Sequence, residues 1–318
     1  MKALVTGGAG FIGSHLAEAL ARRGVDVTVL DNLSGGREAN LAWRLAGAPV
    51  ELVKGSVTDG PLLARLLPGC DWVFHQAAMP SVPRSVLEPV LSNSQNLDAT
   101  LQLLVASRDA GVKRFVFASS SAIYGDSEVS PKHEGLPPNP LSPYGLQKYA
   151  AERYGQLFHL LYGVPTVALR YFNVFGPRQA FDSPYSGVIA RFCTAFLRGE
   201  PPVIFGDGSQ SRDFTYVDNV VAANLAAAEA PPERVAGQVF NVAGGNSITL
   251  LDLVQRLTSI SGRELKPAFQ PARAGDVQHS RADISAAQRA LGFAPTVDWG
   301  EGLRRTYQWY RLGAGLTG

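Results

Sequence analysis

The sequence predicts an α/β fold in which helices cover both faces of a doubly wound parallel sheet. A short apolar strand at Lys2–Thr6 runs directly into a glycine-rich turn and then a helical stretch. Short apolar runs then alternate with helical stretches through the first half of the chain, which is typical of parallel βαβ units. With 318 residues, the chain can form one large domain or two smaller ones around a substantial core.

The first strand ends in the glycine turn Gly7-Gly8-Ala9-Gly10-Phe11-Ile12-Gly13, and a helix is predicted over His15–Arg23. Glycines let backbone amides approach a pyrophosphate at a helix N-terminus, where the helix dipole favours anions. A second strand at Val25–Leu30 ends at Asp31, about twenty residues further on, where a carboxylate can bind ribose hydroxyls. An acid there repels the extra phosphate of NADP, so the sequence favours NAD. For the glycines alone, a plain tight turn is the alternative.

The rest of the first half continues the alternation of strands and helices. Strands are predicted at Val50–Val53, Trp72–Gln76, Phe115–Ser119 and Thr166–Arg170, and helices at Leu91–Ala110 and Tyr144–Tyr162. Because ligands bind beyond the carboxyl ends of such strands, polar residues that follow them are candidate site residues.

Tyr144 and Lys148 are four residues apart, so a helix places the phenol and the ammonium on one face. A phenol titrates near pH 10 in water and becomes a useful base only where a positive charge stabilises the phenolate. Ser120 and Ser121 follow the strand at Phe115–Ser119, where a hydroxyl can hold a substrate hydroxyl against Tyr144. Local capping of the backbone is the alternative for these serines. The pair predicts hydride chemistry at a hydroxyl-bearing carbon.

The second half, from Tyr171 onward, is turn-rich, as is typical of binding loops on a rigid scaffold. Helices are predicted at Val188–Arg198, Val217–Ala230, Leu250–Ile260, Ile284–Leu291 and Glu301–Tyr310, and a strand at Gln238–Val242. Arg212 and Arg273 lie in glycine-bearing loops, where a guanidinium can grip a diphosphate or simply form a surface ion pair. We expect an NAD-binding Rossmann domain from 1–170 with 214–243, and a smaller C-terminal α/β substrate domain from 171–213 with 244–318.

Composition excludes several classes of function. A formal charge of +2, without any block of Lys or Arg, predicts neither a nucleic-acid nor a membrane partner. Cys70 and Cys193 are far apart and the five histidines are scattered, so no metal site is predicted. The glycine turn begins too close to Met1 for a signal peptide, and we expect a cytoplasmic protein.

Four motifs together resemble the extended short-chain dehydrogenase/reductase family, and within it the nucleotide-sugar 4-epimerases. The resemblance runs from residue 1 to about residue 311. The motifs are the segments Thr6–Leu16, Ser119–Gly125, Tyr144–Lys148 and Arg170–Asn173.

The resemblance implies a mechanism. Tyr144 is the base, Lys148 holds the nicotinamide ribose and lowers the pKa of Tyr144, and Ser120 with Ser121 positions the sugar 4-hydroxyl. Hydride passes from the sugar C4 to NAD and returns to the other face after the 4-keto sugar has turned about its diphosphate.

The resemblance also implies two sets of contacts. The cofactor set is Gly7, Gly10, Phe11, Ile12, Gly13, Asp31, Asn32, Ser34, Gly36, Ser56, Val57, Gln76, Ala77, Ala78, Asn96, Tyr144, Lys148 and Tyr171. The substrate set is Ser81, Ser120, Ser121, Tyr144, Asn173, Val188, Arg212, Arg273, Asp276 and Ser280. Ser56 stands where many relatives carry an aspartate facing adenine, and a serine can still form a hydrogen bond there.

The resemblance narrows the reaction and the sugar. Dehydratases and decarboxylases of the family carry acids where this chain has Ser121 and Ala122, so epimerisation at C4 is favoured. Epimerases restricted to plain hexoses carry a tyrosine where this chain has Ser280, and relatives that accept N-acetylhexosamines have a small residue there. The expected enzyme is a UDP-N-acetylglucosamine 4-epimerase that also accepts UDP-glucose or UDP-galactose. A plain loop serine is the alternative for Ser280.

Two rival functions remain. A UDP-glucuronate 4-epimerase would need Arg84, Arg178 or Arg191 to face the sugar carboxylate. A redox-inert NAD sensor or scaffold would not explain why tyrosine, lysine and serine occur together. The resemblance further implies a homodimer in which the helices at Leu91–Ala110 and Tyr144–Tyr162 form a four-helix bundle.

Overall fold

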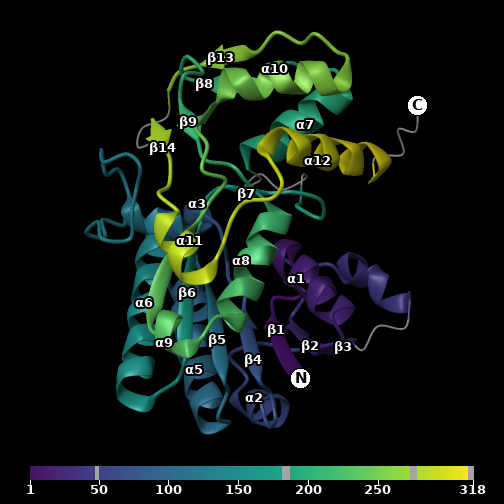
Figure 1. Cartoon of the computed structure of the whole chain (residues 1–318). Helices are drawn as coiled ribbons and strands as arrows, with labels where there is room; N and C mark the ends of the chain where they lie inside the picture. The colour runs from purple at the N-terminus through teal and green to yellow at the C-terminus, as the bar shows by residue number, and fades with distance from the viewer. Residues whose placement is uncertain (47–49, 181–186, 273–277, 314–318) are drawn as a thin grey trace.

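A seven-stranded parallel sheet with the strand order β11-β6-β5-β4-β1-β2-β3 forms the centre of the molecule. The structure, a computed structural model, describes residues 1–46, 50–180, 187–272 and 278–313 (Figure 1). The strands of this sheet are β1 (Lys2–Thr6), β2 (Asp26–Asp31), β3 (Val50–Lys54), β4 (Trp72–His75), β5 (Arg114–Ser120), β6 (Thr166–Tyr171) and β11 (Gln238–Val242). The order reverses between β1 and β4, which makes the sheet doubly wound and confirms the predicted fold class.

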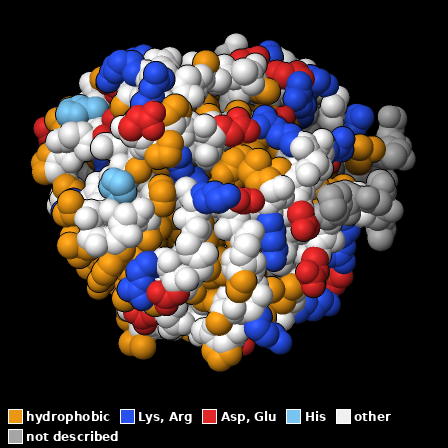
Figure 2. Space-filling view, turned by 60° about the horizontal axis from the view of Figure 1, so that its bottom comes forward, with side chains coloured by type: hydrophobic (Ala, Val, Ile, Leu, Met, Phe, Trp, Pro, Cys, Tyr) orange, Lys and Arg blue, Asp and Glu red, His pale blue; other side chains and the backbone are white. Residues whose placement is uncertain are grey.

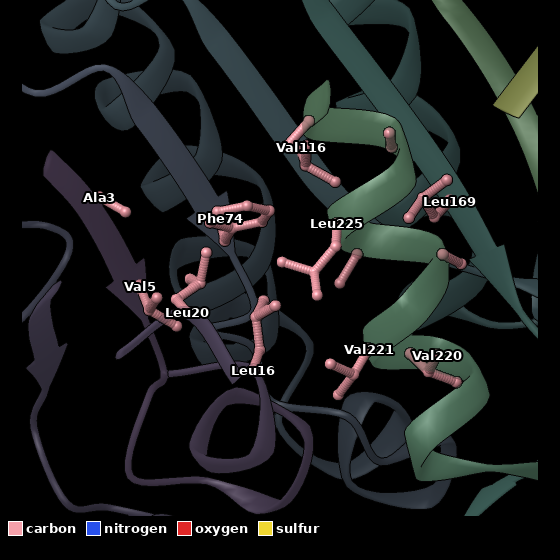
Figure 3. Close-up of a cluster of buried hydrophobic side chains, with 14 of the residues drawn as sticks. Ala3, Val5, Leu16, Leu20, Phe74, Val116, Leu169, Val220, Val221 and Leu225 are labelled. Carbon is pink, nitrogen blue, oxygen red and sulfur yellow. The ribbon is translucent and has the colours of Figure 1, made fainter. Parts of the chain in front are cut away.

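Helices cover both faces of the sheet because successive strand residues point to opposite faces. The covering helices are α1 (Phe11–Arg22) and α8 (Val217–Glu229) on one face, and α2 (Gly60–Leu66), α5 (Ala99–Asp109) and α6 (Pro143–Tyr162) on the other. In β1, Ala3 and Val5 pack with Leu20 of α1 and Leu225 of α8 (Figure 3), whereas Leu4 belongs to the cluster on the opposite face. This alternation buries both faces, as expected for a parallel sheet.

The helix predicted at Leu91–Ala110 is interrupted. It consists of α4 (Pro89–Asn93), a π-helical turn η2 (Ser94–Asp98) and α5. Asn96 lies in this π turn, where its Oδ1 accepts the Met79 N–H at 2.7 Å. A π turn inserts an extra residue per turn and is frequent at functional sites. Here it turns Asn96 inward, where the side chain is 2% exposed.

Other predicted elements agree with the structure to within a few residues, and several short ones were not predicted. The additional elements of the first half are α2, η1 (Glu38–Ala46), α3 (Val82–Leu87) and η3 (Ser121–Tyr124). The helix predicted at His15–Arg23 begins earlier, at Phe11, because Gly10 already serves as its N-cap. The glycine turn therefore points at the N-terminus of α1, as the sequence predicts.

The smaller half lies above the carboxyl ends of the strands in Figure 1. Its elements are β7 (Val174–Phe175), α7 (Val188–Arg198), β8 (Val203–Phe205), β9 (Ser211–Arg212), β10 (Thr215–Tyr216), β12 (Ile248–Thr249), α10 (Leu250–Ser261), β13 (Ala268–Gln270), β14 (His279–Ser280), α11 (Ser285–Leu291) and α12 (Trp299–Gly313). The short helix α9 (Pro232–Val235) instead precedes β11 at the other end of the sheet, where Val235 joins the sheet-side cluster. Helices α7, α10 and α12 share a third hydrophobic cluster. Ala287 of α11 instead joins the sheet-side cluster with α8, so this part of the second half packs on the nucleotide-binding half.

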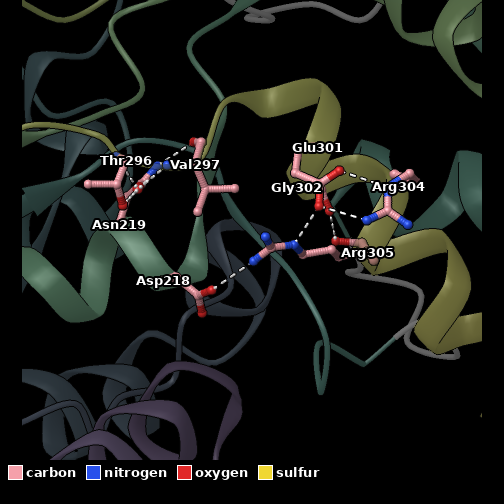
Figure 4. A network of polar contacts seen from close by, with 9 residues as sticks. Asp218, Asn219, Thr296, Val297, Glu301, Gly302, Arg304 and Arg305 are labelled. Carbon is pink, nitrogen blue, oxygen red and sulfur yellow. Dashed lines mark hydrogen bonds and ion pairs between the residues drawn. The ribbon is translucent and has the colours of Figure 1, made fainter.

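A polar network fixes α12 to α8, and therefore the smaller half to the sheet (Figure 4). Asn219 of α8 accepts the N–H groups of Thr296 and Val297 at 2.9 and 3.1 Å and donates to the Val297 carbonyl at 2.8 Å. Beside it, Arg305 of α12 pairs with Asp218 at 3.5 Å. Since Asn219 is buried, these directional bonds restrict movement of one half against the other. No helix in the described ranges is both long and apolar enough to cross a membrane.

Candidate active site

The glycine turn after β1 forms a cradle at the N-terminus of α1. Gly7 has a φ of +66°, and a Cβ there would lie 2.6 Å from the Ala77 nitrogen. A Cβ on Gly13 would lie 2.2 Å from the Gly7 carbonyl oxygen. Both positions need glycine, since only glycine permits this backbone conformation and this close approach. The bare backbone at a helix N-terminus fits the pyrophosphate of a dinucleotide.

Asp31 ties the second strand to this cradle. Its Oδ2 accepts the Ala9 N–H at 2.9 Å and its Oδ1 accepts the Leu33 N–H at 2.8 Å. The carboxylate is therefore held at the carboxyl end of β2, the place predicted for a ribose contact. A Cβ on Gly36 would lie 2.8 Å from Asp31 Oδ2, so the loop after β2 is packed onto the carboxylate.

The remaining predicted adenosine contacts lie around this end of the sheet. Asn32 is exposed, and its Oδ1 accepts both the N–H and the hydroxyl of Ser34, at 3.0 and 2.7 Å. Ser56, after β3, accepts the Thr58 N–H at 3.2 Å, and its neighbour Val57 is buried. Ser56 thus acts as a local turn cap, and its contact with adenine stays a prediction.

Gln76 and Tyr171 meet at the ends of β4 and β6 through a residue that the sequence did not single out. The Gln76 Nε2 donates to the Tyr171 hydroxyl and to Asn224 Oδ1 of α8, both at 3.1 Å. The Asn224 Nδ2 donates to the Tyr171 hydroxyl at 2.7 Å. Burial raises the pKa of Tyr171 to about 12, so it is a neutral hydrogen-bonding group. This triad holds the strand ends together beside Ala77 and Ala78.

Both the oxygen and the nitrogen of the Asn96 side-chain amide form hydrogen bonds. Besides accepting from Met79, its Nδ2 donates to Gln147 Oε1 of α6 at 2.8 Å. Ser92 donates to the same Gln147 oxygen at 2.8 Å. These buried bonds link the π turn to the helix of Tyr144. They fix the orientation of the Asn96 side chain, and its contact with the cofactor stays a prediction.

Tyr144, Lys148 and Ser120 converge at the carboxyl end of β5. Ser142 caps α6 by accepting the Gly145 N–H at 3.1 Å, which places Tyr144 in the first turn. The Lys148 Nζ lies 5.8 Å from the centre of the Tyr144 ring. Ser120 accepts the Ala122 N–H at 3.1 Å, and its hydroxyl acts to lower the pKa of the neighbouring Tyr144. Ser121 follows at the start of η3 and is half-buried.

Burial sets the protonation of this group. Desolvation raises the pKa of Tyr144, and the Ser120 hydrogen bond opposes that rise. Desolvation also lowers the pKa of Lys148 to about 7, against the favourable charge of Glu152. The resemblance implies that Lys148 lowers the pKa of Tyr144, whereas in the ligand-free chain desolvation is the largest influence on the pKa of each group.

A buried ion pair joins α6 to β6, and the sequence analysis did not predict it. Glu152 of α6 accepts from Arg170 Nε at 2.9 Å and Nη2 at 2.8 Å, and from the Ser119 hydroxyl at 2.5 Å. The Arg170 Nη1 donates to the Tyr124 hydroxyl at 2.8 Å. A signal was present, because Glu152 continues the four-residue spacing of Tyr144 and Lys148.

The described residues of the predicted substrate set lie either in loops and short strands of the second half or at the starts of helices. Asn173 has a φ of +36° and donates to the Asp213 carbonyl at 3.0 Å, and Ser280 pairs in register with Arg212 across β14 and β9. Ser81 caps α3 by accepting the Arg84 N–H at 3.2 Å, and Val188 begins α7. Arg273 and Asp276 lie outside the described residues.

The arginines of the glucuronate alternative are engaged elsewhere. Arg84 pairs with Glu88 at 2.5 Å, and Arg178 pairs with Glu18 of α1. The Arg191 guanidinium lies 5.8 Å from the centre of the Phe205 ring. The structure therefore places two of these three charges on carboxylates of the protein itself.

Comparison with known proteins decides the family. A model of the NAD dependent epimerase/dehydratase family matches residues 3–243, more than half of the chain. The chain belongs to this family. The resemblance to the extended short-chain dehydrogenase/reductases is thereby confirmed, and so is NAD as the cofactor, for which the glycine cradle and Asp31 provide the fitting residues.

Several solved structures are similar over almost the whole chain. The UDP-N-acetylglucosamine 4-epimerase of Methanobrevibacter ruminantium is 42% identical, covers 98% of both chains and has a TM-score of 0.93. The UDP-glucose 4-epimerase of Thermotoga maritima is 41% identical, covers 99% of this chain and 100% of its own, and has a TM-score of 0.92. The UDP-glucuronic acid 4-epimerase of Bacillus cereus, solved with UDP-glucuronic acid and NAD, is 34% identical, covers 98% and 99%, and has a TM-score of 0.90.

A relative with a different reaction also matches. A UDP-N-acetyl-α-D-glucosaminuronate decarboxylase of Bacillus cytotoxicus is 34% identical over 98% of both chains. Overall similarity therefore does not distinguish the sugars, and the residues of the site must do so.

Proposed function

We propose that this protein is an NAD-dependent UDP-sugar 4-epimerase whose principal substrates are UDP-N-acetylglucosamine and UDP-N-acetylgalactosamine, with UDP-glucose and UDP-galactose as further substrates. The reaction class rests on the family and on the convergence of Tyr144, Ser120 and Lys148 at the end of β5. The choice of sugar rests on Ser280.

Ser280 supports this choice by its place beside Arg212. Residues in register on neighbouring strands share a face of the sheet, so Ser280 and Arg212 belong to the same face of β14 and β9. If Arg212 holds the diphosphate, the small Ser280 leaves space near the sugar for an acetamido group. The pairing of Arg84 and Arg178 with carboxylates counts against glucuronate as the principal sugar.

In the proposed mechanism, the side chains of this chain handle the proton. The Gly7 and Gly13 cradle and Asp31 would hold NAD, which when bound would supply the hydride acceptor and donor for the sugar C4. Tyr144 takes the proton of the 4-hydroxyl and gives it back, while the nearby Ser120 hydroxyl favours the phenolate by lowering the pKa of Tyr144. Ser121 holds the sugar hydroxyl from the start of η3. Asn173 and Arg212, with Arg273 and Asp276, hold the UDP moiety.

Product analysis tests the assignment. Each UDP-sugar is incubated with the purified protein, and the products are assigned by NMR. We expect interconversion of the N-acetylhexosamines, with slower turnover of the plain hexoses. Turnover of the uronate alone, or release of carbon dioxide from a uronate, would contradict the proposal. Tyr144→Phe is the negative control, with Tyr149→Phe, one turn further along α6, as its matched substitution.

We also propose a homodimer through α6 and the helices before it. Apolar side chains stand exposed on these elements (Figure 2, left side, over the region of α6 in Figure 1). They are Val82, Val86, Leu87, Val90 and Leu91 on α3 and α4, and Leu146, Leu157, Leu160, Leu161 and Tyr162 on α6. A patch of this kind is typical of an interaction surface. The sequence prediction places one side of this interface on the helix at Leu91–Ala110. The exposed apolar residues near that helix lie on α3 and α4 rather than on α5.

The division into domains and the compartment stay proposals. The third hydrophobic cluster, which contains Phe192 and Leu303, supports a separate substrate half, although α11 packs on the sheet side. We propose the cytoplasm as the compartment.

A further inference from the structure

Three ionisable side chains form one row along α6. Tyr144, Lys148 and Glu152 follow at four-residue steps, so they lie on one face of the helix, toward the sheet. Lys148 and Glu152 are 3% and 2% exposed. The row connects the proposed base to a carboxylate that lies too deep to touch the substrate.

Lys148 has no carboxylate of its own. Its ammonium donates to the Ala118 carbonyl at 2.8 Å and lies 4.8 Å from the centre of the Phe117 ring. In the described part of the chain Lys148 forms no ion pair, and Glu152 is the carboxylate whose charge acts on it. The protonation of Lys148 therefore depends on how much of the Glu152 charge reaches it.

Arg170 controls that charge. It comes from β6 and grips both oxygens of Glu152, while Ser119 donates to one of them. Arg170 is itself 4% exposed and directed by the Tyr124 hydroxyl. The positive charge of Arg170 offsets part of the negative charge of Glu152. Glu152 therefore stabilises the charged form of Lys148 less than an unpaired carboxylate would at the same depth.

Other charged groups around Lys148 cannot take this function. His75 of β4 lies beneath it, but burial lowers the pKa of His75 to about 3, and its ring is held neutral between the Thr6 and Thr100 hydroxyls. The charged residues on the helices packed against α6 lie at the surface, in contacts of their own. Arg84 pairs with Glu88, Asp98 accepts a hydrogen bond from the neutral Asn93 amide, and Arg108 pairs with Asp109.

We propose that Arg170 and Glu152 are positioning residues for the catalytic base: Arg170 fixes the Glu152 carboxylate and sets the share of its charge that keeps Lys148 protonated beneath Tyr144. The inference deepens the proposed function, since it concerns the same base. Tyr144 and Lys148 share one proton in the active state, and the phenolate forms only while the proton stays on lysine.

The proposal predicts shifts of opposite sign for the two partners. Glu152→Gln leaves Arg170 and Lys148 as two buried cations, so the midpoint of Lys148 moves to lower pH by about one unit. Arg170→Gln leaves the carboxylate to Lys148 alone, so the midpoint moves to higher pH by about one unit. Loss of packing would not give opposite signs.

The test is a titration of Lys148 in the ligand-free protein. The chain is isotope-labelled at the lysine Cε, and the Lys148 NMR signal is assigned with Lys148→Met. Ser119→Ala is the control, since it removes a hydrogen bond from Glu152 without changing a charge, and its midpoint should stay near that of the wild type. Equal shifts in one direction, or none, would overturn the proposal.

A double variant keeps the test decisive if a single variant does not fold. Glu152→Met with Arg170→Met removes both charges and leaves no buried ion unpaired. Its Lys148 midpoint should lie closer to that of the wild type than the midpoint of either single variant, and a larger shift would contradict the proposal. In turnover, Glu152→Gln should lose about tenfold in kcat at neutral pH with little change in KM. Because the titration needs no sugar, its failure is distinguishable from a wrong substrate assignment.

Discussion

The Lys148 ammonium lies 5.8 Å from the centre of the Tyr144 ring, where Lys148 is buried and Tyr144 is half-buried, and desolvation acts on both side chains. The pKa of Tyr144 is raised and that of Lys148 is lowered, so burial disfavours the charged form of each. The reaction nevertheless needs the phenolate beside the ammonium. The site is therefore a place where function and stability conflict.

Replacing Lys148 by Met should stabilise the ligand-free protein while abolishing turnover. The pKa of Lys148 is lowered from 10.5 to about 7, so between these values the unfolded chain binds more protons than the folded one. Stability of the wild type therefore rises with pH across this window. The gain of Lys148→Met in melting temperature should be largest at neutral pH and shrink as the pH approaches 10.5. A gain that does not depend on pH would contradict this account.

Gly13→Ala should weaken NAD binding. A Cβ there would lie 2.2 Å from the Gly7 carbonyl oxygen, which belongs to rigid backbone, so the cradle must open. We expect a loss of about 1–3 kcal/mol in NAD affinity or in the free energy of unfolding, measured by calorimetry and by melting. Gly60→Ala, at the open first position of α2, is the matched control and should change neither. If Gly13→Ala changed neither the NAD affinity nor the free energy of unfolding, the close packing of Gly13 against Gly7 would be contradicted.

Ser280→Tyr should separate the sugars. The phenol ring fills the space beside Arg212, so turnover of UDP-N-acetylglucosamine should fall by at least about tenfold, and turnover of UDP-glucose should persist. Ser280→Ala removes only the hydroxyl and should keep both activities. Equal losses on both sugars in Ser280→Tyr would mean that Ser280 does not select the sugar.

Leu160→Glu should disrupt the proposed dimer. Leu160 is 76% exposed on α6, and a buried charge at the interface would remain unpaired. Sedimentation should show a dimer for the wild type and a monomer for the variant at micromolar concentration. Leu312→Glu is the control, because Leu312 is 62% exposed on α12, away from the patch. A wild type that sediments as a monomer would remove the proposal.

Most of the site could be predicted where the signal is local. The glycine turn with α1, Asp31 at the end of β2, and the spacing of Tyr144 and Lys148 each depend on residues within one strand, turn or helix. Ser120 could be placed because the end of a predicted strand fixes the edge of the sheet on which it lies.

Residues that act through distant partners were not predictable in this way. Asn224 is far in sequence from both Gln76 and Tyr171, and it becomes their partner only because α8 packs over the ends of β4 and β6. The ion pair of Arg170 and Glu152 was not predictable either, because it forms only when β6 and α6 pack together. The π turn at Asn96 was missed because its sequence reads as ordinary helix.

The sequence by itself determined the doubly wound sheet, the cofactor cradle and the tyrosine–lysine pair, because strand alternation, glycine turns and helical spacing are properties of neighbouring residues. Only the tertiary structure determined the pKa shifts of Tyr144 and Lys148. The pKa of Lys148 near 7 follows from burial among β4, β5 and α6 and from a carboxylate shared with Arg170, and desolvation exists only once these elements are packed together.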